Sequence, residues 1–254
     1  MIAKLLNDRI KPMKGFSHLF HIMLVASLPI GLFVLVRLEF IALAFTLLLL
    51  SKWRIFAVRM RYWPANIRLS IVDVLFGSGI ILAIASADYM STQLIWGFVY
   101  LVWLVYVKPS SLRTMIALQA ILASGLFLAT FTYRYSHFNS LLFVAVFWFV
   151  AYFCARHFLG GFEEEKVGLL ASIWAFFALQ VAWVSSHWLV FFFNDSLAQP
   201  VVLLTAISVG VASLYYLDKE DRLSTFAQKQ IIFSTIFIVV VIVALSGYWG
   251  DKTI

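Results

Sequence analysis

The sequence predicts an all-α, polytopic integral membrane protein with about nine transmembrane helices, short loops and one interfacial amphipathic helix. Three observations lead to this fold class. The 254 residues are 63% hydrophobic and only 12% charged. The apolar residues form runs close to the roughly 20 residues that a helix needs to cross a bilayer. The Lys and Arg residues gather in the short gaps between these runs. Because backbone polar groups in lipid must be satisfied within the chain, the runs are expected to be helices.

We expect one transmembrane domain over residues 1–254, because the apolar runs follow one another with only short gaps. The first two runs together contain so few residues that two crossings of about 17 to 20 residues each barely fit. The topology therefore depends on whether residues 18–51 form a hairpin of two spans. The expected spans are 18–36, 39–51, 69–87, 92–107, 112–132, 138–155, 166–190, 199–217 and 230–249.

The stretch between the second and third runs is rich in cations and aromatic rings. On a helical wheel at about 100° per residue, its apolar side chains gather on one side and its cations on the two flanks. A helix of this kind lies in the membrane interface, with its rings among acyl chains and its cations at the phosphates. We expect it to end at Pro64. The predicted lipid-binding residues are Lys52, Arg54, Arg59, Arg61 and Arg68.

Positive charges predict how the chain is oriented. With nine crossings, three cations lie opposite the N-terminus, namely Arg37, Arg134 and Lys252, and sixteen lie on its own side. This division predicts a bacterial-type cytoplasmic membrane protein with a cytoplasmic N-terminus and an exported C-terminus. Merging the first two spans would spoil the division. The sixteen are Lys4, Arg9, Lys11, Lys14, Lys52, Arg54, Arg59, Arg61, Arg68, Lys108, Arg113, Arg156, Lys166, Lys219, Arg222 and Lys229.

The formal net charge of +7 bears on the partners of the chain. In a soluble protein it would point to nucleic acid. Here the basic residues lie next to the predicted spans, so the anionic head groups of membrane lipids are the expected partners, with other membrane proteins as a further class. No nucleic-acid partner is expected.

Asp73 is the one carboxylate predicted deep within a span, where an ionisable group needs a partner. A ridge of small residues, Gly79, Ala83 and Ala87, lies beside it on the helix and would let a neighbouring helix approach closely. Two interpretations follow. Asp73 is either a proton- or cation-responsive group, or, as we favour, one side of a structural ion pair with Arg59, Arg61 or Arg68.

Two amides, Gln119 and Gln180, are predicted near mid-membrane. Either could line a polar cavity, but the favoured role is a hydrogen bond between helices. Among the histidines, His18 and His21 share a helix face without a Cys or acidic residue nearby in the sequence. We therefore predict no metal site.

Three consecutive acids, Glu163, Glu164 and Glu165, interrupt the otherwise basic face. Successive residues on a helix point in different directions, so they do not form an ion cage. They could cap the following helix through its dipole, or dock a basic partner.

No catalytic residues or cofactor can be assigned from the sequence. Gly77-Ser78-Gly79 resembles the serine motif of rhomboid intramembrane proteases, but Phe76 stands where that motif has its first glycine. The favoured function is that of a membrane-embedded subunit or scaffold acting through helix packing and lipid or protein contacts. The alternative is a transporter or lipid-handling permease, and an intramembrane enzyme comes third. The sequence does not identify a substrate.

Overall fold

The computed structural model describes residues 16–57, 59–135, 139–188, 192–193 and 197–245. The described chain is helical apart from turns and one short antiparallel pairing, in which Phe192 faces Ala198 and Phe193 faces Leu197. Its elements are α2 (Phe16–Arg37), α3 (Ile41–Leu50), η1 (Trp53–Ile55), η2 (Met60–Tyr62), α4 (Trp63–Ser86), α5 (Met90–Val102), η3 (Trp103–Val107), α6 (Arg113–Arg134), α7 (Ser140–Gly160), α8 (Val167–Trp188), β1 (Phe192–Phe193), β2 (Leu197–Ala198), α9 (Gln199–Lys219) and α10 (Thr225–Leu245).

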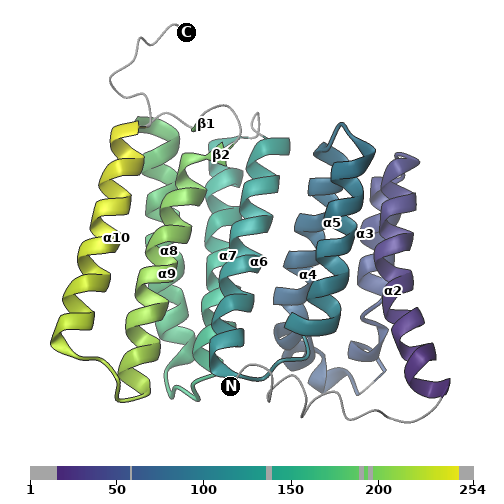
Figure 1. Cartoon of the computed structure of the whole chain (residues 1–254), viewed down its shortest axis with the longest axis horizontal. Coiled ribbons are helices and arrows are strands. Elements are labelled where there is room, and N and C mark those ends of the chain that lie inside the picture. Colours follow the sequence, from purple (N-terminus) through teal and green to yellow (C-terminus); the bar gives the residue numbers. More distant parts are fainter. Residues whose placement is uncertain (1–15, 58, 136–138, 189–191, 194–196, 246–254) are drawn as a thin grey trace, which may run out of the picture.

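The helices stand side by side and alternate in direction, so that successive connections fall at opposite ends of the bundle (Figure 1). Among the described residues, seven helical stretches could cross a membrane by length and composition: 60–86, 90–107, 113–134, 140–160, 167–187, 199–219 and 225–244. These seven make the chain a multi-pass membrane protein in architecture. Of the N-terminal pair, α2 has 22 residues, but α3 has only ten and rises only about 15 Å.

The expected spans correspond to helices, with shifted ends. α10 begins at Thr225 rather than at residue 230, because the Ser224 hydroxyl accepts a hydrogen bond from the Ala227 backbone N–H at 3.1 Å. α7 begins after Asn139, whose side chain accepts from the Leu141 N–H at 2.9 Å. Both caps satisfy backbone donors that the first turn of a helix leaves open.

The basic stretch differs from the single amphipathic helix that the wheel predicts. It forms two short 3-10 helices, η1 and η2, and the backbone at Arg59 between them is extended, with φ −57° and ψ 138°. Pro64 does not end a helix here. It lies in the first turn of α4, where a proline costs no backbone hydrogen bond, and α4 therefore starts at Trp63 rather than near residue 69.

α4 is the most enclosed helix and packs against α2, α3, α5, α6 and α7. Gly79 permits the close approach of α6, because a Cβ at this position would lie 3.1 Å from the Phe127 backbone. On another face, a Cβ at Gly77 would meet Leu48 of α3 at 2.7 Å. The small residues of α4 thus let α3 and α6 approach it on different sides.

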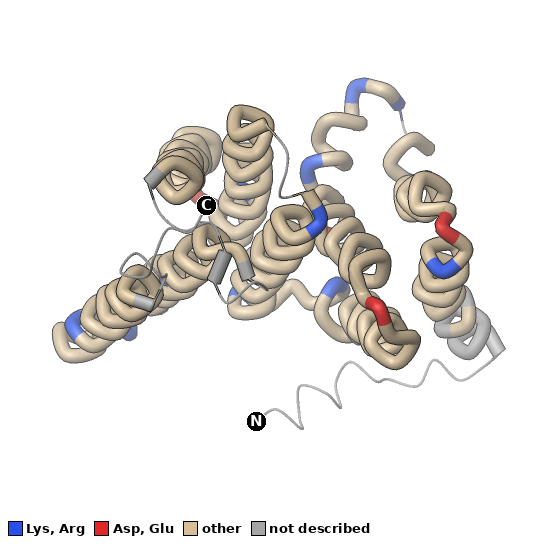
Figure 2. Tube along the Cα trace, turned by 90° about the horizontal axis from the view of Figure 1, so that it is seen from above, with Lys and Arg blue, Asp and Glu red and all other residues tan. Residues whose placement is uncertain are grey.

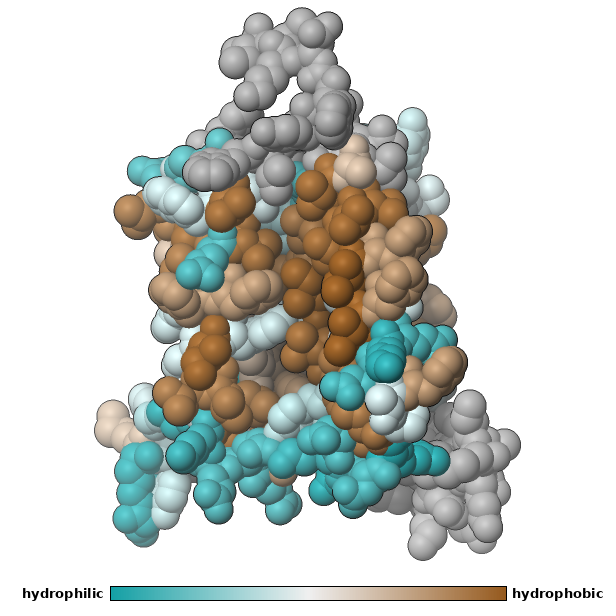
Figure 3. All heavy atoms as spheres, turned by 90° about the vertical axis from the view of Figure 1, so that its left-hand side faces the viewer, coloured by the Kyte–Doolittle hydropathy of each residue, from teal (hydrophilic) through white to brown (hydrophobic). Residues whose placement is uncertain are grey.

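Hydrophobic side chains cover the middle of the face in Figure 3, and hydrophilic side chains gather at its lower end. Figure 2 looks along the helices and shows that Lys, Arg, Asp and Glu occupy only a few places on the trace. Lys and Arg are unevenly divided between the ends. Among the described residues, those in or next to the upper connections are Arg37 and Arg134, and those in or next to the lower ones are Lys52, Arg54, Arg59, Arg61, Arg68, Lys108, Arg113, Arg156, Lys166, Lys219, Arg222 and Lys229.

Candidate functional site

Asp73 lies in a buried cluster of charged groups at the lower end of the bundle. Its Oδ2 accepts hydrogen bonds from Lys52 and pairs with Lys108 Nζ at 2.7 Å. Its Oδ1 accepts from the Trp103 Nε1–H at 2.9 Å. The Lys52 and Asp73 side chains are each 9% exposed, whereas that of Lys108 is 42% exposed. The carboxylate therefore holds two cations, of which one can still reach water.

Three segments bring this cluster together. Lys52 follows the end of α3, and Asp73 lies in α4. The end of α5 winds into the π-helix η3, and the N–H of Lys108, the residue after η3, bonds to the Trp103 carbonyl at 2.8 Å. Phe76, three residues beyond Asp73, stacks on Trp103 with ring centroids 3.7 Å apart and planes at 7°. Stacking and hydrogen bond together fix the indole against the carboxylate.

Two cations share one carboxylate in this cluster. Burial lowers the pKa of Lys52, because desolvation outweighs the attraction of Asp73, and the positive charge of Lys108 acts in the same direction. Removing the carboxylate would leave a buried ammonium without its counter-charge, which is expensive. Asp73 thus ties together α3, α4 and α5.

The predicted partners of Asp73 were arginines, and the structure pairs it with lysines instead. Arg59, Arg61 and Arg68 are exposed, and Arg61 lies over the ring of its neighbour Tyr62 at 4.6 Å. The side chain of Arg54 lies outside the described part of the structure, as do those of His18 and His21. Of the five predicted lipid-binding residues, Lys52 is thus inside the bundle, and three point outward.

Gln119 of α6 links three segments. Its Nε2 donates to the Val107 carbonyl at 2.6 Å and to the Ser110 carbonyl at 3.2 Å, and its Oε1 lies 2.9 Å from His157 Nε2 of α7. The Val107 carbonyl also accepts from the Ser110 N–H at 3.2 Å, so the amide reinforces the turn that follows η3. Gln180 has a different position: it is exposed on the outer side of α8, where the described residues offer it no hydrogen bond.

The three acids after α7 also differ in their exposure and in their partners. Glu163 and Glu165 are exposed. Glu164 accepts a hydrogen bond from the Tyr215 hydroxyl and pairs with Lys219 Nζ at 2.5 Å, which ties the α7–α8 connection to α9. The hydrogen bonds from Lys219 and Tyr215 lower the pKa of Glu164. Only Glu163 and Glu165 therefore remain turned outward for a partner.

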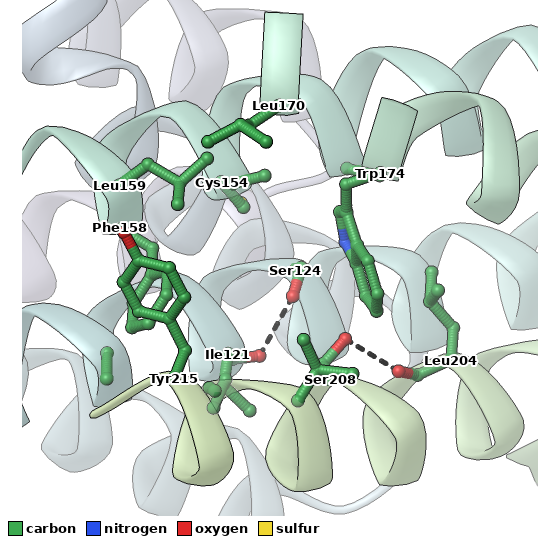
Figure 4. Close-up of a pocket in the computed structure, with 16 residues that line it drawn as sticks. Ile121, Ser124, Cys154, Phe158, Leu159, Leu170, Trp174, Leu204, Ser208 and Tyr215 are labelled. Carbon is green, nitrogen blue, oxygen red and sulfur yellow. Dashed lines mark hydrogen bonds between the residues drawn. The ribbon is translucent and has the colours of Figure 1, made fainter. Parts of the chain in front are cut away.

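A cavity of about 220 Å³ lies between α6, α7, α8 and α9, a feature that the sequence analysis missed (Figure 4). Small side chains create it, because alanines line it where larger residues would fill the space. Its two serines bond back to their own helices, Ser124 to the Ile121 carbonyl at 3.1 Å and Ser208 to the Leu204 carbonyl at 2.6 Å. The lining residues are Ala117, Ala120, Ile121, Ser124, Ala151, Cys154, Ala155, Phe158, Leu159, Leu170, Trp174, Leu204, Ser208, Val211, Ala212 and Tyr215.

Polar groups lie at the lower end of this cavity. Tyr215 lines the cavity and donates its hydroxyl hydrogen bond to Glu164. Leu170 lines both the cavity and a neighbouring surface hollow that holds Glu164, Lys166 and Lys219. We call Glu164, Lys166, Tyr215 and Lys219 the polar rim. An apolar space with charged groups at one end matches the two parts of an amphipathic molecule.

The lining determines what the cavity can hold. Apolar cavities of about 150 Å³ stay free of water and take up molecules such as benzene. A space somewhat larger than this has room for part of an acyl chain or a small ring system. Groups of three or more His, Cys, Asp or Glu side chains that could hold a metal ion do not occur in the described ranges.

Small residues recur at regular intervals on two of the helices that line this cavity. Ala117, Ala120 and Ser124 recur every three or four residues on α6, as do Ala151 and Ala155 on α7. Such a pattern usually indicates close helix packing, so sequence alone does not distinguish a tight contact from a hollow.

No protein-family model, curated protein or solved structure matches the chain. Its function therefore has to be argued from its own residues.

Proposed function

We propose that the chain is a multi-pass membrane protein that binds an amphipathic lipid, with an acyl chain in the cavity between α6, α7, α8 and α9 and the head group at the polar rim. The observation that carries this proposal is the apolar cavity with its charged lower end. It favours the lipid-handling alternative over the membrane-embedded subunit or scaffold that the sequence alone favours.

The rim lies at the level where a head group belongs. Glu164, Lys166 and Lys219 are in or next to the lower connections of the bundle, beyond the apolar middle of the helices. Lys219 and Glu164 pair with each other at 2.5 Å, whereas the exposed Lys166 offers a cation to a phosphate and its neighbour Glu165, which lines the same hollow, offers a carboxylate to an amine. The rim and Glu165 together thus offer both charges of a zwitterionic head group.

The topology that accompanies this proposal has nine crossings, with the basic lower end in the cytoplasm and the C-terminus exported. The excess of Lys and Arg at the lower end supports it through the positive-inside rule. α3 is short for a crossing, and we propose that Trp53, Phe56 and Met60, which are 61%, 51% and 72% exposed, extend the apolar surface below it into the interface.

In this topology the exposed Arg59, Arg61 and Arg68 bind anionic head groups. Each such cation near a charged membrane surface contributes roughly 1 kcal/mol of binding free energy. Replacing all three by Gln should therefore lower the enrichment of spin-labelled phosphatidylserine around the reconstituted protein and leave that of phosphatidylcholine unchanged. An unaltered enrichment of phosphatidylserine would remove this part of the proposal.

Photolabelling tests the cavity directly. A phospholipid with a photoreactive group in its acyl chain should label peptides that contain Ala117–Ser124 and Ala151–Leu159. The variant Ala155→Phe fills the cavity and should lose this labelling. The matched control Ala42→Phe changes an exposed position of α3 and should keep it. Equal labelling of the cavity peptides in both variants would show that the lipid does not occupy the cavity.

A further inference from the structure

α8 carries two opposite stripes of residues that both repeat at alternating intervals of four and three. The inner stripe consists of small side chains that are at most 1% exposed. α8 packs mainly along α7, and small residues at this repeat allow two helices to approach closely in a left-handed pair. The inner residues are Ala171, Ala175, Ala178, Ala182 and Ser185.

The outer stripe has the same repeat, large side chains and no covering element in the described structure. Leu169, Ile173, Phe176 and Trp183 are 60%, 59%, 57% and 47% exposed, and Gln180 and His187 are exposed with them. A spacing of four and three is the geometry in which side chains of two helices interlock along a seam. Every face of an α-helix repeats at this spacing, so the polar group in this stripe, and not the spacing, singles it out.

Gln180 gives this stripe a polar group near the middle of the helix. It lies eight residues before Trp188, which corresponds to about 12 Å along the axis. This distance to the end of the helix is longer than the side chain, so the amide does not reach the head groups. An amide without a hydrogen-bond partner in hydrocarbon costs free energy. Glutamines in membrane helices satisfy their amide groups by hydrogen-bonding to another helix.

We propose that the outer stripe of α8 is the interface of a homodimer in which Gln180 bonds to Gln180 of the second copy. All copies insert in the same orientation, so two α8 helices from two copies run parallel. A two-fold axis along the membrane normal then places identical residues opposite one another. An amide both donates and accepts, so Gln180 is complementary to itself. This interface stands independently of the lipid proposal.

Disulfide crosslinking tests the interface in native membranes. Cys154 is the only cysteine of the chain, so Gln180→Cys in a Cys154→Ala background carries a single thiol. Oxidation should yield a dimer of this chain, and Phe176→Cys and Trp183→Cys should do the same. The control Ile238→Cys, which is 46% exposed on α10 and equally far from the lower end of its helix, should stay monomeric.

A second measurement addresses the amide itself. Energy transfer between labelled copies in liposomes should show that Gln180→Leu weakens dimerisation about 3- to 30-fold, whereas Gln180→Asn retains most of it. Photolabelling of the cavity should be unchanged in both variants, which shows that they fold. The proposal is overturned if Gln180→Cys gives no dimer, if Ile238→Cys crosslinks equally, if the adduct contains another protein, or if Gln180→Leu dimerises like the wild type.

Discussion

Replacing Asp73 by Asn removes the charge that holds Lys52 and Lys108 in the buried cluster. Asn has nearly the same shape and keeps an oxygen that can accept the Trp103 N–H, whose bond to Asp73 is 2.9 Å long. The substitution therefore reports mainly the loss of the carboxylate charge. We expect it to weaken the attachment of the segment after α3 to α4 and α5.

The magnitude follows from the burial of each partner. Lys52 is 9% exposed and would be left as a buried, uncompensated cation, and breaking a buried ion pair from one side costs about 3 to 5 kcal/mol. The Lys108 side chain is 42% exposed, so its contribution resembles that of a surface pair, about 0 to 1 kcal/mol. We therefore expect Asp73→Asn to lower the free energy of unfolding by about 3 to 5 kcal/mol, and Lys108→Gln by less than about 1 kcal/mol.

Equilibrium unfolding in mixed micelles with increasing SDS provides the comparison. Glu220→Gln is a control, because it breaks the partly exposed pair with Arg113, in which the two charged atoms are 2.9 Å apart. It should also cost less than about 1 kcal/mol. The reasoning is refuted if Asp73→Asn is as stable as the wild type, or if Lys108→Gln costs as much as Asp73→Asn.

Two further predictions concern helix packing and pH. Gly79→Ala should destabilise the protein by about 1 to 3 kcal/mol, because the new Cβ would lie 3.1 Å from the Phe127 backbone, whereas Gly97→Ala meets nothing within 4 Å and should stabilise α5 by about 0.5 to 1 kcal/mol. Both are measured by the same unfolding assay, and an equal effect of the two substitutions would contradict the packing described for α4 and α6. Hydrogen bonds from Lys219 and a tyrosine hydroxyl hold the pKa of Glu164 below its ordinary value of 4.5, so these contacts stabilise the rim above pH 4.5 and are lost as the pH falls through the lowered value. Carbon NMR of the labelled carboxyl group checks this titration, and a midpoint at or above 4.5 would show that the contacts do not form.

Helix existence was predictable here because apolar runs are bounded by charged residues, and each expected span corresponds to a helix. The segment between α3 and α4 was harder. A helical wheel assumes a continuous helix, and it cannot detect the extended backbone at Arg59. Pro64 was also ambiguous, since proline is found both after the end of a helix and in its first turn.

The partners of Asp73 depend on how helices are placed against each other. Lys52 and Lys108 lie 21 and 35 positions from it in the sequence, and the winding of η3 brings the second lysine into reach. Arginines closer in sequence were the simpler expectation, yet they point outward. Contacts between helices follow from their register, which a single sequence does not specify.

The cavity was not predictable for a related reason. Alanine and serine at intervals of three and four fit equally well with two helices in contact and with two helices that leave a hollow. Which of them forms depends on the larger residues at the edges, here Phe158, Trp174 and Tyr215. Their side chains come from α7, α8 and α9, so the hollow is a property of four helices together.

A density map of the protein in lipid nanodiscs tests lipid binding most directly. We predict elongated density between α6, α7, α8 and α9 that runs along Ser124, Cys154 and Ser208 and ends at Glu164 and Lys219. A space collapsed by the surrounding side chains, or a well-resolved cavity without such density, would contradict the proposed function.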